Sequence, residues 1–310
     1  MIKKSFGKTL KEKLEASAKD KLHTFIMADG QVRGAIVHGT RMINEMRGNF
    51  ELGILETLVL GHAYLGAALI SGSLKGQDQV RIKIDCSGPI KGISVEANAL
   101  GEVRGFLKNI PIPVKNPTAT THLSPFFGAG FLEVTKILED AKHPFTGKIM
   151  IEYGSLAKDL ANYFLTSEQI PTAFNLSIHF DDGGNVTGAG GLFLQAMPGH
   201  DDHTMADIEN AISDVPIIGE KFSQGVSPET LVNMMFDQFN PVILDNHRIE
   251  FFCRCTEKRI LDYIAMLPLA DLEEIIENGP FPVETRCHNC NTQYRFSKED
   301  MEKLYQKRIK

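Results

Sequence analysis

The chain has 310 residues, a net charge of −6, 43% hydrophobic residues and 23% charged residues. These values are ordinary for a globular protein and exclude a disordered chain, a collagen and a protein with many membrane spans. The length predicts two domains, or one domain with an appendage. The acidic balance argues against dedicated nucleic-acid binding, so we expect no nucleic-acid partner.

The first 20 residues are rich in lysine and lack an apolar stretch, so we predict an N-terminal extension over residues 1–20 and no signal peptide. Residues 52–70 are apolar enough to resemble a membrane span. This stretch also contains Glu56, His62 and many small residues that permit close packing. We therefore predict a buried core helix and no membrane association.

The chain up to residue 198 mixes strand and helix patterns. Asp29-Gly30, between two apolar runs, predicts a hairpin, and residues 80–86 alternate between apolar and polar side chains as in a strand with one buried face. Further strands are predicted at 93–97, 102–106 and 147–153, a helix at 156–165, and a second hairpin from 174–180 and 186–194. We predict an α+β fold in which residues 1–198 form a mixed-sheet core domain with a buried helix.

Residues 199–245 differ from the rest because they contain nine acidic residues and a single lysine. Apolar residues recur at helical spacing, and Ser227 followed by Pro228 is typical of a helix start. Acidic repulsion opposes compaction while the apolar faces favour it. We predict an acidic helical linker that folds against a neighbour; a plain pair of connecting helices is the alternative that the pattern alone favours.

Four of the five cysteines form two tight pairs near the C-terminus, Cys253-x-Cys255 and Cys287-x-x-Cys290. Two thiolate pairs brought together form the usual four-sulfur site of structural zinc. We therefore predict that residues 246–310 form a small zinc-binding module, in a reducing compartment, with these four cysteines as the metal ligands. Such a closed ligand set leaves no position for a catalytic water. Reduced free thiols in a small core are the alternative.

The cysteine pairs also suggest sensitivity to oxidation. Nearby basic residues, among them Arg254, Arg259 and Arg286, would favour thiolates, although these bases are equally compatible with a solvated surface. Structural zinc contributes about 10–16 kcal/mol in small fingers, against about 5–15 kcal/mol for the stability of a whole domain. We therefore expect oxidation to unfold the module and the linker that leans on it. Cys86, on the buried face of its strand, is expected to be inert, and His247 and His288 are expected not to bind metal.

No conventional active site is recognisable. The glycine-rich stretches match neither the dinucleotide fingerprint nor the phosphate loop, and the hydrolase motifs are missing. We predict no enzymatic activity and no catalytic residues. Three alternatives remain open: a zinc ribbon that binds nucleic acid or protein, a thiol–disulfide oxidoreductase using Cys287 and Cys290, and a zinc-stabilised protein for which oxidation is damage. Ligation of every thiolate argues against the oxidoreductase.

Several motifs together resemble the redox-regulated 33-kDa heat-shock chaperone family, over roughly residues 21–306. The motifs that carry the resemblance are Gln31-Val32-Arg33-Gly34, the helix from Gly61 to Leu69, Gly88-Pro89-Ile90, Gly101-Glu102-Val103-Arg104-Gly105, Ser167 to Ala173, Ala189-Gly190-Gly191 and the two cysteine motifs.

The resemblance implies an ATP-independent holdase of the cytoplasm. In the reduced form, Cys253, Cys255, Cys287 and Cys290 would hold one Zn²⁺ and the protein would be inactive. Oxidation would form the disulfides Cys253–Cys255 and Cys287–Cys290, release the zinc and unfold the module and linker. The protein would then bind unfolding client proteins and tend to form a homodimer.

Overall fold

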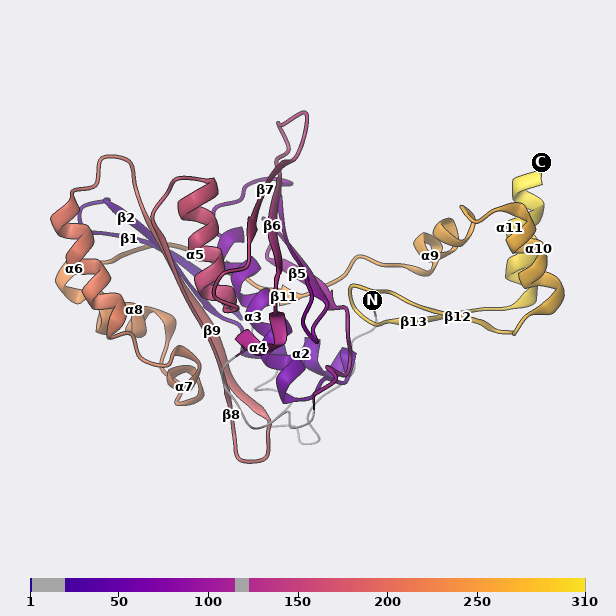
Figure 1. Ribbon diagram of the computed structural model, residues 1–310, viewed down its shortest axis with the longest axis horizontal. Helices are drawn as coiled ribbons and strands as arrows, with labels where there is room; N and C mark the ends of the chain where they lie inside the picture. The colour runs from indigo at the N-terminus through magenta and orange to yellow at the C-terminus, as the bar shows by residue number, and fades with distance from the viewer. Residues whose placement is uncertain (2–19, 115–122, 310) are drawn as a thin grey trace.

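Two β-sheets pack around one central helix in the structure, a computed structural model that describes residue 1, residues 20–114 and residues 123–309. Figure 1 shows helix α3 (Ile54–Ser71) between the sheets and the C-terminal part of the chain projecting to one side. Most of the extension predicted over residues 1–20 lies outside the described residues. The α+β fold class predicted from the sequence is confirmed.

The five-stranded sheet has the order β10-β1-β2-β9-β8, the six-stranded sheet has the order β11-β5-β4-β3-β6-β7, and β12 pairs with β13 alone. The strands are β1 (Lys21–Met27), β2 (Val32–His38), β3 (Gln79–Cys86), β4 (Gly92–Asn98), β5 (Glu102–Leu107), β6 (Gly130–Ile137), β7 (Phe145–Met150), β8 (Thr172–Phe180), β9 (Val186–Ala196), β10 (Val242–Arg248), β11 (Glu250–Phe251), β12 (Val283–Arg286) and β13 (Gln293–Phe296). The other helices are α2 (Thr40–Phe50), α4 (Ser124–Phe127), α5 (Leu156–Ser167), α6 (Asp202–Ser213), α7 (Ile218–Ser223), α8 (Pro228–Phe236), α9 (Glu257–Ile264), α10 (Leu269–Asn278) and α11 (Lys298–Ile309), with a 3₁₀ turn at Asp237–Phe239.

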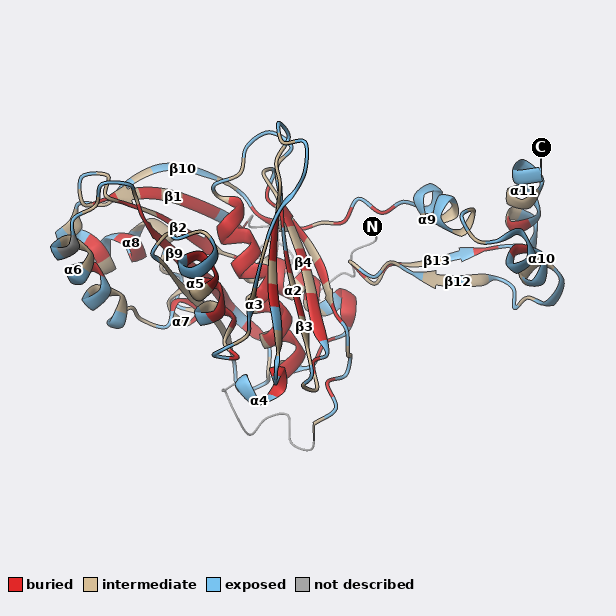
Figure 2. Ribbon diagram, turned by 45° about the horizontal axis from the view of Figure 1, so that its top comes forward, coloured by how far each residue is buried: buried red, intermediate tan, exposed pale blue. Residues whose placement is uncertain are grey.

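The central helix is buried because nearly all its faces are apolar or small. Within the described part of the chain, α3 is the one helix long and apolar enough to cross a membrane, and 83% of it is buried inside the structure. Tyr64 lies in the middle of α3 and donates a hydrogen bond to the carbonyl oxygen of Gly105 in β5. The buried helix predicted from the sequence is therefore a core helix, as Figure 2 shows by its burial.

The predicted hairpins and strands are confirmed with small shifts at their ends. β1 pairs with β2 around the Asp29-Gly30 turn, where both residues have a positive φ, and β8 pairs with β9. The strand predicted at 147–153 is β7, which begins earlier and ends at Met150. Helix α2 and strand β6 carried no pattern that predicted them.

Three linker helices cover the outer face of the five-stranded sheet (Figure 1). Helix α7 packs on β8 and β9, and α8 packs on β1 and β2. The Ser227 side chain caps α8 by accepting a hydrogen bond from the Thr230 backbone N–H, as the sequence predicts. The linker apolar cluster between helices and sheet consists of Phe25, Met27, Val32, Ile36, Leu192, Leu194, Ile208, Ile218, Phe222, Leu231, Val232 and Phe236.

The chain returns to the core immediately after these helices, because β10 pairs antiparallel with β1 at the sheet edge. This strand was not predicted, and it continues past residue 245, where we expected the linker to end. Close packing also ties α7 to the core: a Cβ on Gly188 of β9 would lie 1.9 Å from the carbonyl oxygen of Gly219, so a larger residue would separate them. The linker is thus fitted to the sheet rather than only connected to it.

One buried histidine, His23, and one half-buried histidine, His38, contact the linker helices. His23 Nε2 of β1 lies 2.9 Å from a carboxylate oxygen of Glu229 in α8, and the His38 ring of β2 stacks on Phe222 of α7 at 4.4 Å between centroids. Burial lowers the pKa of both histidines, although Glu229 opposes this shift at His23. Both are therefore favoured in the neutral form while the linker is packed.

Acidification is expected to loosen the linker. A histidine released from the fold takes up a proton near pH 6.5, whereas the packed histidine stays neutral to lower pH. The free energy that stabilises linker packing is therefore greatest above about pH 6.5 and decreases as the pH drops below it. We expect residues 218–236 to be cleaved faster by a protease at about pH 5.5 than at about pH 7.5. His38→Gln should reduce this pH dependence; an unchanged dependence in that variant would contradict the assignment to His38.

The C-terminal part beyond β11 extends away from the core (Figures 1 and 2). Helices α10 and α11 pack against each other at its far end, and the β12–β13 hairpin reaches back so that its turn touches the core. Most residues of this part are exposed or half-buried. Its buried side chains include Leu272, Cys290, Phe296 and Met301. A small core of this kind depends on additional constraints for stability.

Candidate metal centre

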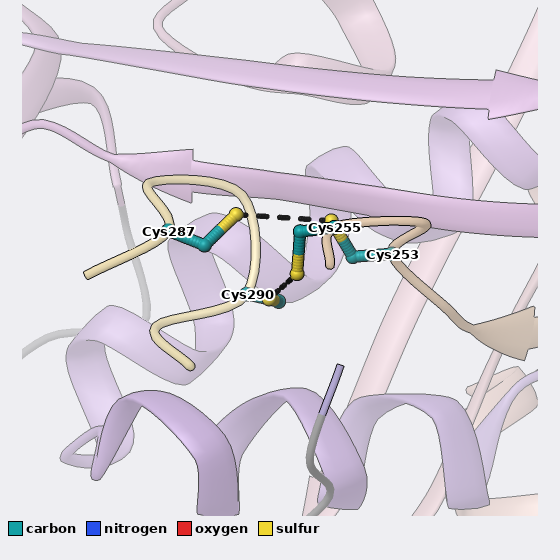
Figure 3. A group of neighbouring side chains, drawn as sticks. All are labelled: Cys253, Cys255, Cys287 and Cys290. Atoms are coloured by element: carbon teal, nitrogen blue, oxygen red, sulfur yellow. Dashed lines mark hydrogen bonds between the residues drawn. The ribbon is translucent and has the colours of Figure 1, made fainter. Parts of the chain in front are cut away.

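Two loops bring the four paired cysteines together. Cys253 and Cys255 follow directly after β11, and Cys287 and Cys290 lie in the turn between β12 and β13. The second loop is closed by backbone hydrogen bonds to the Cys287 carbonyl oxygen from Cys290 and Asn291, whose φ is positive. This tight turn places two sulfurs on the same side, facing the first loop (Figure 3).

The sulfur atoms are spaced as a tetrahedral zinc site requires. All four lie within 4.8 Å of one another. Cys253 Sγ is 3.8 Å from Cys287 Sγ, and Cys255 Sγ is 3.3 Å from Cys290 Sγ (Figure 3). Zinc–sulfur bonds of about 2.3 Å place the sulfurs of a tetrahedron about 3.8 Å apart. The four cysteines can therefore hold a metal ion, and their soft thiolate chemistry suits zinc.

Three neighbouring side chains contact individual sulfurs. The Tyr294 hydroxyl donates to Cys255 Sγ at 3.1 Å, and Thr292 Oγ1 lies 3.2 Å from Cys290 Sγ. The Arg104 guanidinium, from β5 of the core, donates to Cys253 Sγ at 3.8 Å. Such outer contacts partly neutralise thiolate charge and orient the ligands.

The thiol pKa values show where negative charge is best stabilised. The hydrogen bond from the Cys287 thiol lowers the pKa of Cys253, with a smaller lowering from Arg104. The same hydrogen bond raises the pKa of Cys287 to about 11, and a hydrogen bond with Cys253 raises the pKa of Cys290. The thiols titrate as one coupled group, and the Arg104 contact favours negative charge on Cys253, the sulfur that this arginine faces.

The basic residues expected to promote thiolates act differently in the structure. Arg254 donates to both carboxylate oxygens of Glu102 in β5, at 2.7 Å each, so its charge joins the module to the core. Among the described residues, the cation that contacts a sulfur is Arg104, which is also paired with Glu96. The sequence did not predict a role for Arg104 at the metal site, because this residue lies some 150 positions before the cysteines. Arg104 was noted only as part of the family motif at residues 101–105.

The second metal loop is anchored to α2 of the core through Asn49. The Asn49 side chain is buried and donates to the Cys290 carbonyl oxygen at 2.9 Å. In return, the Asn291 side chain donates to the Asn49 carbonyl oxygen at 2.9 Å. The Gly105 N–H of β5 also donates to the Asn289 carbonyl oxygen at 3.2 Å. Folding of the core thus positions half of the ligands.

Replacing Asn49 by alanine is expected to speed metal release. The change leaves the buried Cys290 carbonyl without this donor, at a cost of about 1–3 kcal/mol. We expect the zinc-loaded Asn49→Ala variant to lose its metal roughly tenfold faster to a chromogenic chelator. Asn44→Ala is the matched control, because Asn44 also lies in α2 but donates to the Thr40 and Val186 carbonyls, away from the metal loops. Equal release rates in the two variants would contradict the anchoring role.

The remaining candidates lie outside the cluster. Cys86 is half-buried beside the main core, and burial raises its pKa, in agreement with an inert thiol. The ring of His288 lies against Phe106 at 5.6 Å between centroids. His247 lies in β10, and its pKa is lowered by burial. Neither histidine belongs to the group of possible metal ligands found among the described residues.

The fold and site define a class of protein in which a two-sheet core carries a docked module with four clustered cysteines. The family model described as Hsp33 protein matches residues 20–297. A 33 kDa chaperonin of Geobacillus sp. is 32% identical over 280 residues, covering 90% of this chain and 94% of that protein. One of Ruminiclostridium cellulolyticum is 32% identical over 286 residues, covering 91% and 97%.

A solved structure shows the same architecture. The crystal structure of a 33 kDa chaperonin (heat shock protein 33 homolog) from Thermotoga maritima superposes with a TM-score of 0.85 at 29% identity, covering 94% of this chain and 99% of that one. The chain belongs to the Hsp33 family. This confirms the family resemblance found in the sequence, and it places the chain among chaperones rather than enzymes.

Proposed function

We propose that this chaperone is a redox-regulated, ATP-independent holdase. The observation that carries the proposal is the cluster of four thiols made by two loops, each of which is tied to the core. An event at the sulfurs therefore changes how the module sits on the core. A constitutive zinc ribbon would not need these ties, and an oxidoreductase would need an unligated attacking thiolate.

In the reduced state, Cys253, Cys255, Cys287 and Cys290 would hold one Zn²⁺. The ion would supply a crosslink between two loops that are separated by 31 residues of the chain. Tyr294, Thr292 and Arg104 would offset the charge of the thiolates. In this state the module, β11, β10 and the linker helices remain on the core, and the linker apolar cluster stays covered.

In the oxidised state, the four thiolates give up four electrons. Two molecules of peroxide and four protons accept them and become four molecules of water, while two disulfides form and the thiolates release the zinc as Zn²⁺. The nearest sulfur pairs in the structure join the two motifs. We propose that the disulfides form within the motifs, Cys253–Cys255 and Cys287–Cys290, because once the loops separate each cysteine stays near its own motif partner.

The pairing is open to a direct test. Trypsin cleaves after Arg286 and Arg295, so Cys287 and Cys290 lie in one peptide. After oxidation we expect this peptide in the mass spectrum as a single species that lacks the two thiol hydrogens. Recovery of the peptide crosslinked to the Cys253 or Cys255 peptide would contradict pairing within motifs.

Chaperone activity would arise when the linker helices leave the apolar sheet face that they cover. When the module unfolds, β10 and the linker helices lose their C-terminal support, and the charge of the acidic linker favours separation. The apolar face of β1, β2 and β9 then becomes accessible to exposed apolar segments of unfolding proteins. We propose a division into a core domain (1–198, with 1–20 as an extension), a linker (199–245) and a redox-switch module (246–310), a cytoplasmic location and a homodimer in the oxidised form.

The proposal is tested by light scattering from a protein that aggregates on heating. We expect suppression of aggregation by a peroxide-treated, zinc-depleted sample and none by the anaerobic zinc-bound protein. A treated sample that is then reduced and reloaded with zinc should lose the activity again. Suppression by the reduced form alone, or by neither form, would contradict an activating switch.

A further inference from the structure

The segment that precedes the first cysteine pair is bound to the core as an added strand. β11 pairs in parallel with the edge strand β5, with Glu250 opposite Glu102 and Phe251 opposite Val103. The Glu250 N–H donates to the Gly101 carbonyl oxygen at 2.9 Å, and the Phe252 N–H donates to the Val103 carbonyl oxygen at 3.0 Å. Backbone hydrogen bonds thus hold this segment to the edge of the six-stranded sheet.

The side chains of the segment alternate between the core and solvent. Ile249, Phe251 and Cys253 are buried, with Phe251 fully inaccessible and its ring 6.1 Å from that of Tyr64 in α3. The intervening Glu250 and Phe252 are only half-buried. This is the pattern by which a sheet edge recognises an extended peptide: main-chain bonds give binding and alternate pockets give selectivity.

The edge is shaped for a close backbone approach. Gly101 has a φ of +78°, and a Cβ at this position would lie 1.9 Å from the Arg248 carbonyl oxygen. Another backbone can therefore lie directly on this residue. The second metal loop covers the next position along the edge, where Gly105 donates to Asn289. The two segments that cover the β5 edge, β11 and the second metal loop, therefore both belong to the parts of the chain that carry the metal ligands.

We propose that the β5 edge is an acceptor site for an extended segment of an unfolding protein, which joins the sheet in the place of β11. The inference rests on the proposed function, since β11 must leave with the oxidised module. The ligand class is a peptide strand with apolar side chains at alternate positions, because β11 shows which strand this edge accepts. An uncovered edge would otherwise present unpaired N–H and C=O groups, as aggregation-prone edges do.

The test uses a fluorescent peptide with the sequence of residues 247–254, carrying Cys253→Ser. We expect it to bind the peroxide-treated, zinc-depleted protein at least tenfold more tightly than the zinc-bound protein, by fluorescence anisotropy. Two derivatives carry a single N-methyl group and differ only in its position. Methylation at Phe252 removes the donor to Val103, whereas methylation at Phe251 leaves both edge bonds intact.

We expect methylation at Phe252 to weaken binding about tenfold relative to methylation at Phe251. Equal affinities of the two methylated peptides would overturn edge recognition in favour of unspecific apolar contact. Equal binding of the unmodified peptide to the treated and the zinc-bound protein would also overturn the proposal, because β11 would then not compete for the edge. A treated protein that suppresses aggregation without binding the peptide contradicts this inference alone. A treated protein that binds the peptide without suppressing aggregation supports the acceptor edge and contradicts the proposed function.

A variant pair provides a second test from the side of the protein. Phe251→Ala removes the fully buried side chain that anchors β11, and Phe252→Ala removes its half-buried neighbour on the same strand. With zinc bound, we expect the first variant to bind the peptide about tenfold more tightly than the second. Equal binding by the two zinc-bound variants would contradict competition between β11 and the peptide for one edge.

Discussion

Replacing Cys287 by serine is expected to abolish stable zinc binding and to release the linker without any oxidant. Structural zinc contributes about 10–16 kcal/mol in small modules, and a hydroxyl in place of one thiolate removes a large part of this. The β12–β13 turn then loses its link to the Cys253 loop. We expect the purified variant to contain little zinc and residues 199–245 to be cleaved rapidly by a protease under reducing conditions.

The matched control is Cys86→Ser, which removes a half-buried thiol that lies outside the sulfur cluster. This variant should retain stoichiometric zinc and a protected linker. If Cys287→Ser loses its metal while the linker stays as protected as in the control, metal binding and linker packing are not coupled. Full retention of zinc in Cys287→Ser would remove Cys287 from the ligand set.

Placing a charge inside the linker apolar cluster is expected to activate the protein while the metal stays bound. Phe236 of α8 has no exposed surface, and its ring packs on Phe25 of β1 at 6.4 Å between centroids. Loss of such a buried aromatic ring costs about 3–5 kcal/mol, and Phe236→Asp adds the cost of a buried carboxylate. We expect α8 to leave the sheet and the reduced, zinc-bound variant to suppress client aggregation.

The same helix offers a control for the added charge. Met234 is 62% exposed, so Met234→Asp changes the charge of α8 equally without entering the cluster. This variant should remain inactive until it is oxidised. If the Phe236→Asp variant has a protease-sensitive linker and bound zinc but does not suppress aggregation, uncovering the sheet face is not sufficient for chaperone activity. Activity would then require the oxidised module itself.

The parts of the fold that were predictable depend on local pattern. The Asp29-Gly30 hairpin, the buried helix α3 and the Ser227 cap are each specified by a few neighbouring residues, because turn geometry, apolar periodicity and capping act over short distances. The sulfur cluster was also predictable, since ligand type and spacing are visible in the sequence.

The parts that were not predictable depend on partners far along the chain. No residue of β10 is buried, and it is a strand because β1 offers an edge more than 200 residues earlier. β11 has two residues and depends likewise on β5. Arg104 and Asn49 reach the metal loops only through the tertiary fold, so no local signal distinguishes them from other polar residues on sheet and helix surfaces.

The pairing of β1 with β10 has a consequence for biosynthesis. The ribosome completes β1 early, but the linker helices and β10 emerge only after strands β1 to β9 have been made. Until residue 236 has left the exit tunnel, the sheet face that α7 and α8 cover is bare, and until residue 248 has left it, the outer edge of β1 has no partner from its own chain. Every newly made copy therefore passes through a stage in which its apolar surface is accessible, before any oxidant is met. Nascent chains of this protein should require protection of their own from neighbouring polypeptides until residue 248 has emerged.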